Sequence, residues 1–144
     1  MAGVGTYLNF PGTCDEVFQF YKSVFGGEFT SVMRTGDMPP PPGAPALTDA
    51  QKKRIMHIAL PIVGGHVLMG SDTPELQQKL VVGNNVYISL WIDSKEEADR
   101  LYKALSEGGK TEMAPADQFW GDYWGSWADK YGTQWMVTVL GKKK

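Results

Sequence analysis

Two histidines, one cysteine and a run of aromatic rings are the side chains in this sequence best suited to chemistry or to ligand contact. His57 lies in the first arm of a predicted hairpin, IMHIALPIVGGHVLMGSD, and Asp72 ends the second arm. A short turn at the central glycine pair places Leu60 opposite Met69 and His57 opposite Asp72. A hydrogen bond between the latter two would fix the imidazole tautomer and favour its protonated form, as a general acid–base or a polar pocket anchor requires. The favoured interpretation is a structural His–Asp pair that pins the hairpin.

Cys14 is the one cysteine of the chain, so no internal disulfide can form, which suits a reducing compartment. Its position in the first turn of a predicted helix would let the helix dipole lower the pKa of the thiol. No histidine or other base lies nearby in the sequence. We therefore expect an ordinary thiol rather than a nucleophile.

The segment FWGDYWGSWADKYGTQWMVTVL carries four of the five tryptophans. Glycines interrupt it, which favours two strands turned at Asp129–Gly132 over one amphipathic helix. Trp127 and Trp135 are expected in the core. Aromatic rings also offer large rigid surfaces to planar ligands. Trp120 and Trp124 lie where the loop enters the first of these strands. A role as pocket walls and a role as packed residues are equally favoured for both.

Two similar helices are predicted to position these groups, TCDEVFQFYKSVFGG (13–27) and SKEEADRLYKALSEGG (94–109). Each opens with a hydroxyl residue followed three places later by glutamate, the pattern of a capping box. Each then places apolar residues at helical spacing and ends in a glycine pair, where a left-handed backbone stops a helix. The shared order of three independent signals indicates an internal duplication.

Predicted strands surround both helices in the same order. GTYLNF precedes the first helix as NNVYISLWID precedes the second, and EFTSVMR and KTEM follow them. Each half then continues into a hairpin, so the fold class is α+β with two βαβββ modules in one domain. The first module covers about residues 1–72, a polar linker 73–83 and the second module about 84–141.

A proline-rich excursion, GDMPPPPGAPALTDA (36–50), interrupts the first module. Proline excludes it from a helix interior and from a central strand. It is too long for a tight hairpin, so it is interpreted as a lid or a packing arm, or equally as a tolerated surface loop.

Composition excludes several classes of function. The 144 residues carry a net charge of −2, and no basic face for nucleic acid is visible. No signal peptide and no segment of membrane-spanning length is present, so a cytoplasmic protein is expected. Gly64-Gly65 lacks the strand–loop–helix setting of a phosphate cradle, and no cofactor is predicted.

Four stretches in order resemble one family. They are YLNFPGTCDEVFQFYKSVFGG, IMHIALPIVGGHVLMGSD, ISLWIDSKEEADRLYKALSEGG and FWGDYWGSWADKYGTQWMV. The sequence is similar to PhnB-like proteins of the glyoxalase/bleomycin-resistance (vicinal oxygen chelate) superfamily, some of which are labelled demethylubiquinone methyltransferase-like. The resemblance implies cup-shaped mixed sheets, a homodimer and, in many enzymes, one divalent metal. Histidine and glutamate side chains from the first, fourth, fifth and eighth strands hold that metal.

Matching these positions to the sequence gives Thr6, or Tyr7 if the register slips by one, then Met69, Tyr87 and Met136. Phenol and thioether groups are poor ligands for hard or borderline divalent ions. No metal site is therefore predicted.

The resulting hypothesis is a metal-independent protein that binds a small aromatic or planar ligand in a pocket between sheets, with His57 and Asp72 at its edge as candidate catalytic residues. One alternative is a divalent-metal glyoxalase or dioxygenase-type enzyme in which His57 and acidic groups such as Asp72 converge as displaced ligands. Another is a non-catalytic protein that sequesters a drug or metabolite. Whether the protein is an enzyme stays open. The predicted pocket residues are Tyr7, Met69, Tyr87, Trp120, Trp124 and Met136.

Overall fold

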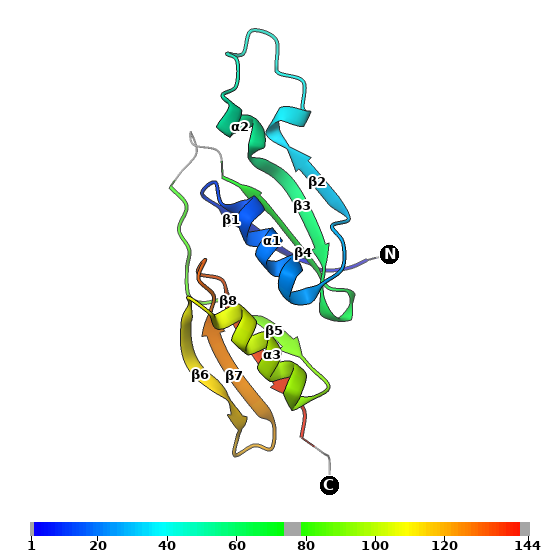
Figure 1. Ribbon diagram of the computed structural model, residues 1–144, viewed down its shortest axis with the longest axis vertical. Helices are drawn as coiled ribbons and strands as arrows, with labels where there is room; N and C mark the ends of the chain where they lie inside the picture. The colour runs from blue at the N-terminus through cyan, green and yellow to red at the C-terminus, as the bar shows by residue number, and fades with distance from the viewer. Residues whose placement is uncertain (1, 74–78, 142–144) are drawn as a thin grey trace. The chain divides into compact units, whose positions relative to one another are not determined.

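The computed structural model describes residues 2–73 and 79–141. The chain divides into two compact units, Met1–Leu80 and Val81–Lys144. The boundary between them falls inside the linker predicted over 73–83, part of which lies outside the described residues. Figure 1 shows that each unit consists of one helix laid against a sheet, with further short helices in the first unit.

The first unit forms a four-stranded sheet in the order β1-β4-β3-β2. β1 runs parallel to β4, and the other neighbouring pairs are antiparallel. Its elements are β1 (Thr6–Phe10), α1 (Cys14–Phe25), β2 (Ser31–Arg34), the 3-10 turn η1 (Thr35–Asp37), α2 (Asp49–Lys53), β3 (Ile55–Pro61), the 3-10 turn η2 (Val63–Gly65) and β4 (Val67–Asp72).

The second unit repeats this topology, with the order β5-β8-β7-β6 and a parallel pair between β5 and β8. Because the strand–helix–three-strand order and both pairing patterns recur, the predicted α+β fold of two βαβββ modules is confirmed. KTEM proves to be the start of an eight-residue strand. The elements are β5 (Ile88–Trp91), α3 (Lys95–Ser106), β6 (Lys110–Asp117), β7 (Tyr123–Ala128) and β8 (Gln134–Val139).

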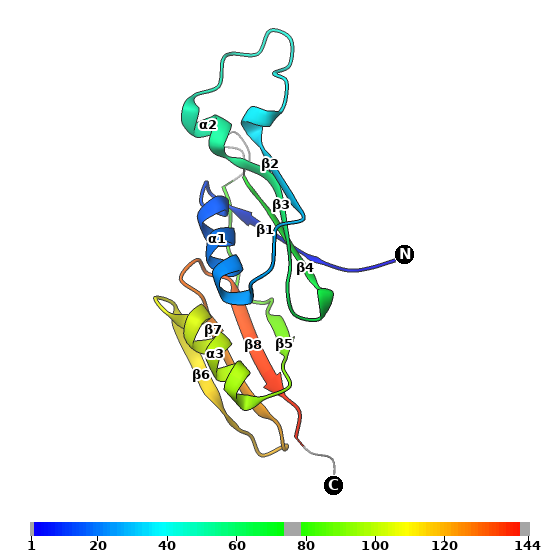
Figure 2. The same cartoon turned by 45° about the vertical axis from the view of Figure 1, so that its right-hand side comes forward.

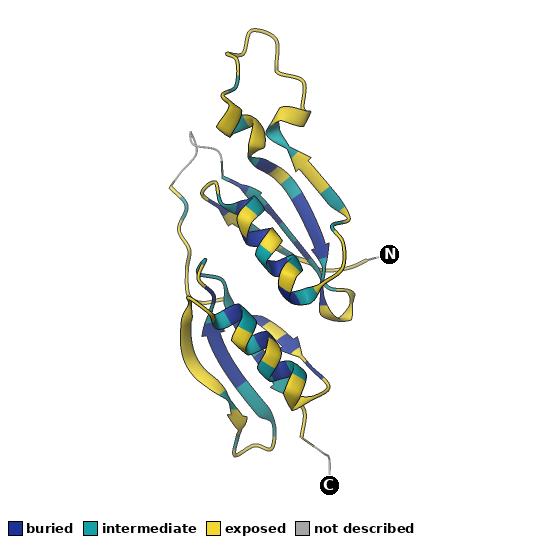
Figure 3. Ribbon diagram, in the orientation of Figure 1, coloured by how far each residue is buried: buried dark blue, intermediate teal, exposed yellow. Residues whose placement is uncertain are grey.

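In each unit one face of the sheet is covered by the helix, and that side forms the core. Figure 3 shows the buried stripes along both helices. In the first unit the ring of Phe18 lies so close to Gly70 that a Cβ there would stand 2.7 Å from the ring, so this position accepts only glycine without displacement. Fully or almost fully buried side chains of this core are Val17, Phe18, Tyr21, Ile58, Leu60 and Leu68.

The two helices begin by different means. Ser94 caps α3, because its side chain accepts from the backbone N–H of Glu97 at 3.2 Å. The Glu97 side chain pairs with Arg100, so only the serine half of the predicted capping box is present. Thr13 makes no such bond, so the capping box predicted for α1 is wrong. The carboxylate of Asp72 takes its place and accepts from the N–H of Cys14 at 2.9 Å and of Gly12 at 3.1 Å. A cap supplied from the end of β4 leaves no pattern in the helix sequence.

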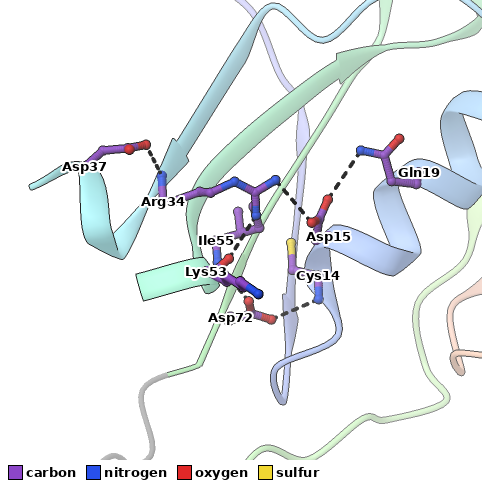
Figure 4. A network of polar contacts seen from close by, with 8 residues as sticks. All are labelled: Cys14, Asp15, Gln19, Arg34, Asp37, Lys53, Ile55 and Asp72. Atoms are coloured by element: carbon purple, nitrogen blue, oxygen red, sulfur yellow. Dashed lines mark hydrogen bonds and ion pairs between the residues drawn. The ribbon is translucent and has the colours of Figure 1, made fainter. Parts of the chain in front are cut away.

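Asp72 also accepts from the backbone N–H of Ile55 at 2.9 Å, so one buried carboxylate joins β4 to the starts of α1 and β3 (Figure 4). Three charge-assisted hydrogen bonds satisfy donors that the fold would otherwise leave unpaired.

The described residues include no helix that is both long and apolar enough to cross a membrane.

We expect Asp72→Ala to lower the free energy of unfolding of the first unit by about 3 kcal/mol, because buried N–H groups lose their acceptor. Ser94→Ala is the matched control in the second unit and should cost about 1 kcal/mol, as usual for an N-cap. Urea unfolding followed by circular dichroism measures both variants, and tryptophan fluorescence reports separately on the second unit, which holds all five tryptophans. An Asp72 variant no less stable than the Ser94 variant would contradict a structural role for this carboxylate.

Candidate functional site

The face of the first sheet away from α1 carries the first group of predicted site residues. Tyr7 pairs with Met69 across β1 and β4, and Met69 pairs with Ala59 of β3. Because side chains alternate along a strand, these residues point to the face of the sheet away from the buried core residues. The ring of His57 lies 5.9 Å from that of Tyr7, at an interplanar angle of 32°. Tyr7, Met69 and His57 therefore share this open face.

Two polar residues that the sequence analysis missed adjoin this group. Asn9 pairs with Ser71, and the Ser71 hydroxyl donates to the Asn9 side-chain oxygen at 3.2 Å. Each lies two residues beyond a predicted site residue, Tyr7 or Met69, on the same strand. The period-two alternation of a strand is the signal that would have found them.

The predicted pairing of His57 with Asp72 is wrong. Leu60 pairs with Leu68 rather than with Met69, because the β3–β4 connection has three residues, Val63–Gly65, instead of two. A shift of one residue moves a side chain to the other face of a sheet. His57 accordingly lies on the open face, while Asp72 binds backbone N–H groups on the helix side.

This separation also removes the basis of the displaced-ligand metal site, which required His57 and Asp72 to converge. Across residues 2–73 and 79–141, no three His, Cys, Asp or Glu side chains are grouped so that they could hold a metal ion.

The open face of the second sheet is more apolar. Met136 pairs with Ser89 and Ser126, and Ser126 pairs with Met113. Trp124 lies two residues before Ser126 on β7, so its side chain is on the same open face. Trp127 and Trp135 point to the helix side instead and are fully buried. The prediction that Trp127 and Trp135 are core residues is therefore confirmed.

Tyr87 immediately precedes β5, at one edge of this sheet, and its hydroxyl donates to both carboxylate oxygens of Glu112, at 2.7 and 2.9 Å. Glu112 lies on β6, the opposite edge strand. The hydrogen bond therefore joins the two edges of a four-stranded sheet. Ser126, in the middle of the open face, is only 5% exposed although α3 lies on the opposite side of the sheet. Glu112 had no sequence signal, because a register shift between Thr111 and Met113 breaks the alternation of β6.

The Tyr87–Glu112 contact changes the acidity of the phenol. The hydrogen bond to the carboxylate raises the pKa of Tyr87 above its ordinary value of 10.0, and the negative charge acts in the same direction. Tyr87 thus stays a neutral hydrogen-bonding group at physiological pH and is a poor anionic ligand.

Trp120 lies in the β6–β7 turn rather than on the face of the sheet. It is half-exposed, and its ring makes edge contacts with Phe119 and Trp124 at centroid distances of 5.0 and 6.1 Å. Trp120, Trp124 and Phe119 therefore form one aromatic cluster, most of it facing solvent.

A cavity of about 550 Å³ opens elsewhere in the first unit, beside the start of α1. Of the sequence-predicted candidates, only Asp72 lines it. Asp15, also in its lining, is paired with Arg34 at 3.1 Å, and Asp72 is bound to backbone N–H groups (Figure 4). The two carboxylates named in the lining of this cavity, Asp15 and Asp72, are therefore already engaged in contacts that stabilise the fold.

Cys14 is fully buried beneath this region. Burial raises the pKa of its thiol far above the ordinary value, and the nearby carboxylates of Asp72 and Asp15 add to the shift. A depressed pKa from the helix dipole, the possibility weighed for this position, is therefore wrong.

The comparisons with known proteins agree with this architecture. Residues 4–137 match the family model described as the Glyoxalase/Bleomycin resistance protein/Dioxygenase superfamily, so the chain belongs to that superfamily. It is 29% identical over 143 residues to Protein YjdN of Escherichia coli (strain K12), covering 93% of this chain and 92% of YjdN.

Solved structures show the same fold. Protein PA1353 from Pseudomonas aeruginosa is 35% identical, with a TM-score of 0.83 over 99% of this chain and 100% of that one. A PhnB protein from Bacillus cereus shares the fold at 21% identity, with a TM-score of 0.76 over 96% and 100%. The resemblance inferred from the sequence is thereby confirmed.

The superfamily's divalent metal does not fit the residues present. The matched positions hold the hydroxyl of Thr6 or the phenol of Tyr7, one further phenol and two thioethers. The Thr6 hydroxyl is hydrogen-bonded to Nε2 of His66 at 2.8 Å, and the Tyr87 hydroxyl donates to Glu112. Divalent ions of this kind bind imidazole and carboxylate oxygen or nitrogen donors. No chemical step through such a metal follows from this donor set.

In an alkaline titration, Glu112→Gln should lower the pKa of Tyr87, so that one phenolate forms at lower pH than in the wild type. The sign follows because the carboxylate favours the protonated phenol. The Tyr87–Glu112 hydrogen bond adds to the free energy of unfolding below about pH 10. This contribution is lost as the pH rises through the pKa of Tyr87 in the folded state. Phenolate absorbance measures the change.

Tyr123 provides the internal control. Its hydrogen bond to Asp99 of α3 raises the pKa of Tyr123 to about 12, and Glu112 takes no part in that contact. Tyr123→Phe should remove the transition near pH 12. A Glu112→Gln titration indistinguishable from that of the wild type would show that the Tyr87–Glu112 bond does not form in solution.

The native protein should not react with a thiol-specific disulfide reagent at pH 8, and one equivalent should react after unfolding in denaturant. Both burial and the raised pKa of Cys14 keep the thiolate population negligible. Ala46→Cys, on the exposed excursion, is the positive control and should react at once. Rapid labelling of the wild type would contradict this assignment.

Proposed function

We propose that this protein binds a small planar or aromatic molecule without the help of a divalent metal ion. The observation that carries the proposal is the chemistry of the open faces, where phenol, thioether and indole groups gather. Within the described part of the chain, no three His, Cys, Asp or Glu side chains are grouped to hold a metal ion. The proposal concerns each face separately. The first offers Tyr7, Met69 and His57, and the second offers Met136 and Trp124.

The physical basis is the fit between these groups and a flat apolar ligand. Methionine side chains adapt to irregular apolar shapes, and their sulfur interacts favourably with aromatic rings. Aromatic rings supply rigid stacking surfaces at low entropic cost. Polar groups at the margins, Asn9 and Ser71 on the first face and the Tyr87–Glu112 pair on the second, would orient the ligand through hydrogen bonds.

A thermal-shift screen tests this proposal. Planar aromatic compounds should raise the melting temperature, while aliphatic compounds of equal size should not. Met136→Ala should weaken binding of a hit about tenfold if the second face is the site, since a central apolar contact contributes more than about 1 kcal/mol. Tyr7→Ala tests the first face in the same way. Val63→Ala, in the β3–β4 connection, is the matched control and should leave binding unchanged.

The metal-free part of the proposal has its own test. Purified protein should contain only substoichiometric divalent metal, and a chelator should not change the ligand-induced shift. Stoichiometric metal, or loss of binding on chelation, would overturn it. Turnover of a bound compound would then identify an enzyme, and tight binding without product would identify a sequestering protein.

A further inference from the structure

We propose that Met33, Met56 and His57 form a binding site for a soft monovalent metal ion, Cu(I), with two thioether sulfurs and one imidazole nitrogen as its ligands. All three residues lie on β2 and β3 of the first unit. The divalent metal of the superfamily is matched to the first, fourth, fifth and eighth strands, so this site differs from it in both place and chemistry. Neither methionine takes part in the proposed binding of a planar molecule.

A bulge in β3 turns the three side chains to one face of the sheet. Met33 pairs with His57, but the next pair of the two strands involves Ile55, so Met56 is an extra residue in β3. In a regular strand, side chains three residues apart point to opposite faces, yet Ile55 and Ile58 are both fully buried in the core. The bulge resolves this conflict, because it lets Met56 and His57 both point to the open face.

Hydrogen bonds at the same end of the sheet hold this bulge in place. The N–H of Thr35 donates to the carbonyl of Arg54 at 2.9 Å, and the Arg34 guanidinium donates to the carbonyl of Lys53 at 2.9 Å (Figure 4). The same guanidinium pairs with Asp15 of α1, so its positive charge lies on the helix side of the sheet. The face that carries the two methionines is therefore free of this cation.

The proline excursion joins the two strands of the site. Figures 1 and 2 show that it runs out from the end of β2 and returns to the start of β3. It returns through α2, an unpredicted short helix in which Thr48 and Gln51 form a reciprocal capping box, the T-x-x-Q pattern that could have revealed it. Only Arg54 separates α2 from β3, so this cap also fixes where β3 begins. Residues 38–46 of the excursion are all exposed (Figure 3).

The two thioethers are accessible from solvent. Met33 is 41% exposed and Met56 is 42% exposed, and β2 is an edge strand of the sheet. Side chains directly opposite one another on neighbouring strands have Cβ atoms about 5 Å apart, which applies to Met33 and His57. Methionine is unbranched and has three rotatable bonds, so its sulfur can turn toward a shared ion without movement of the backbone.

His57 offers a ring nitrogen that is not otherwise engaged. Its ring lies 5.9 Å from that of Tyr7, which positions the imidazole on the open face. Among the residues that the structure describes, none is hydrogen-bonded to the ring nitrogens of His57. The other histidine differs, because Nε2 of His66 is hydrogen-bonded to the Thr6 hydroxyl at 2.8 Å.

This set of donors selects a soft ion. Thioether sulfur favours Cu(I), and imidazole is also a good copper ligand. Hard divalent ions require oxygen donors, and the three residues provide no carboxylate. The site is therefore compatible with the absence of a divalent metal from the proposed ligand-binding function.

Titration with Ag(I) locates the site directly, because Ag(I) has the ligand preferences of Cu(I) and does not change its oxidation state. In protein labelled with carbon-13 at the methionine methyl groups, the signals of Met33 and Met56 should shift and saturate at one equivalent. Met113, 45% exposed on β6, is the matched control and should not shift. Zn(II) at the same concentration should shift none of them. Equal shifts at Met113, or no shift at Met33 and Met56, would overturn the proposal.

The affinity for Cu(I) itself is measured without oxygen, by competition with the coloured chelator bicinchoninate. Met33→Leu, Met56→Leu and His57→Phe should each raise the Kd about tenfold or more, since loss of even an outer partner of a metal ligand costs about that much. Leucine preserves the volume of methionine, and circular dichroism confirms that each variant is folded. Met113→Leu and His66→Phe should leave the Kd unchanged. Equal losses in these two controls would contradict a specific site.

The thiol of Cys14 requires its own control, because a thiolate also binds Cu(I). Cys14 is fully buried, so Cys14→Ala should bind Cu(I) with the affinity of the wild type. Loss of Cu(I) binding in a folded Cys14→Ala protein would place the ion on the thiol and overturn the proposal.

The result is separable from that of the thermal-shift screen, although His57 belongs to both proposed sites. Met33→Leu should weaken Cu(I) binding and leave the shift caused by planar compounds unchanged. A protein that binds planar compounds but not Ag(I) would contradict only the metal site. A protein that binds Ag(I) at Met33 and Met56 but no planar compound would support the metal site and contradict only the ligand-binding function.

Discussion

The carboxylate of Asp72 is the constraint on which the first module depends. It ends β4 and accepts hydrogen bonds from the backbone N–H groups at the starts of α1 and β3. A charged acceptor with three donors in a buried position cannot be moved without leaving several polar groups unpaired. It therefore fixes α1 on one face of the sheet. The other face, which carries Tyr7 and His57, is not covered by α1.

The two modules share a topology but differ in how they are held. α3 begins with a local cap from Ser94, whereas α1 takes its cap from a residue 58 positions away along the chain. Their open faces differ in the same way, one with polar Asn9 and Ser71 beside an aromatic pair, the other with methionines, a tryptophan and an edge-to-edge hydrogen bond. A duplicated fold has thus acquired two chemically distinct surfaces.

Membership of the superfamily accounts for the architecture and leaves the chemistry to the individual side chains. The positions that the family resemblance matches to metal ligands carry hydroxyl, phenol and thioether groups here, and the proposed function rests on the chemistry of those groups.

The sequence by itself determined the two long helices, most strands, the duplication and the burial of Trp127 and Trp135, because glycine stops and hydrophobic periodicity are local signals. Only the tertiary structure decided which side chains meet. A hairpin connection longer by one residue put His57 and Asp72 on opposite faces, and a bulge brought Glu112 to Tyr87 across the sheet. Such outcomes depend on register and on contacts between distant segments, and no residue spacing within one strand records them.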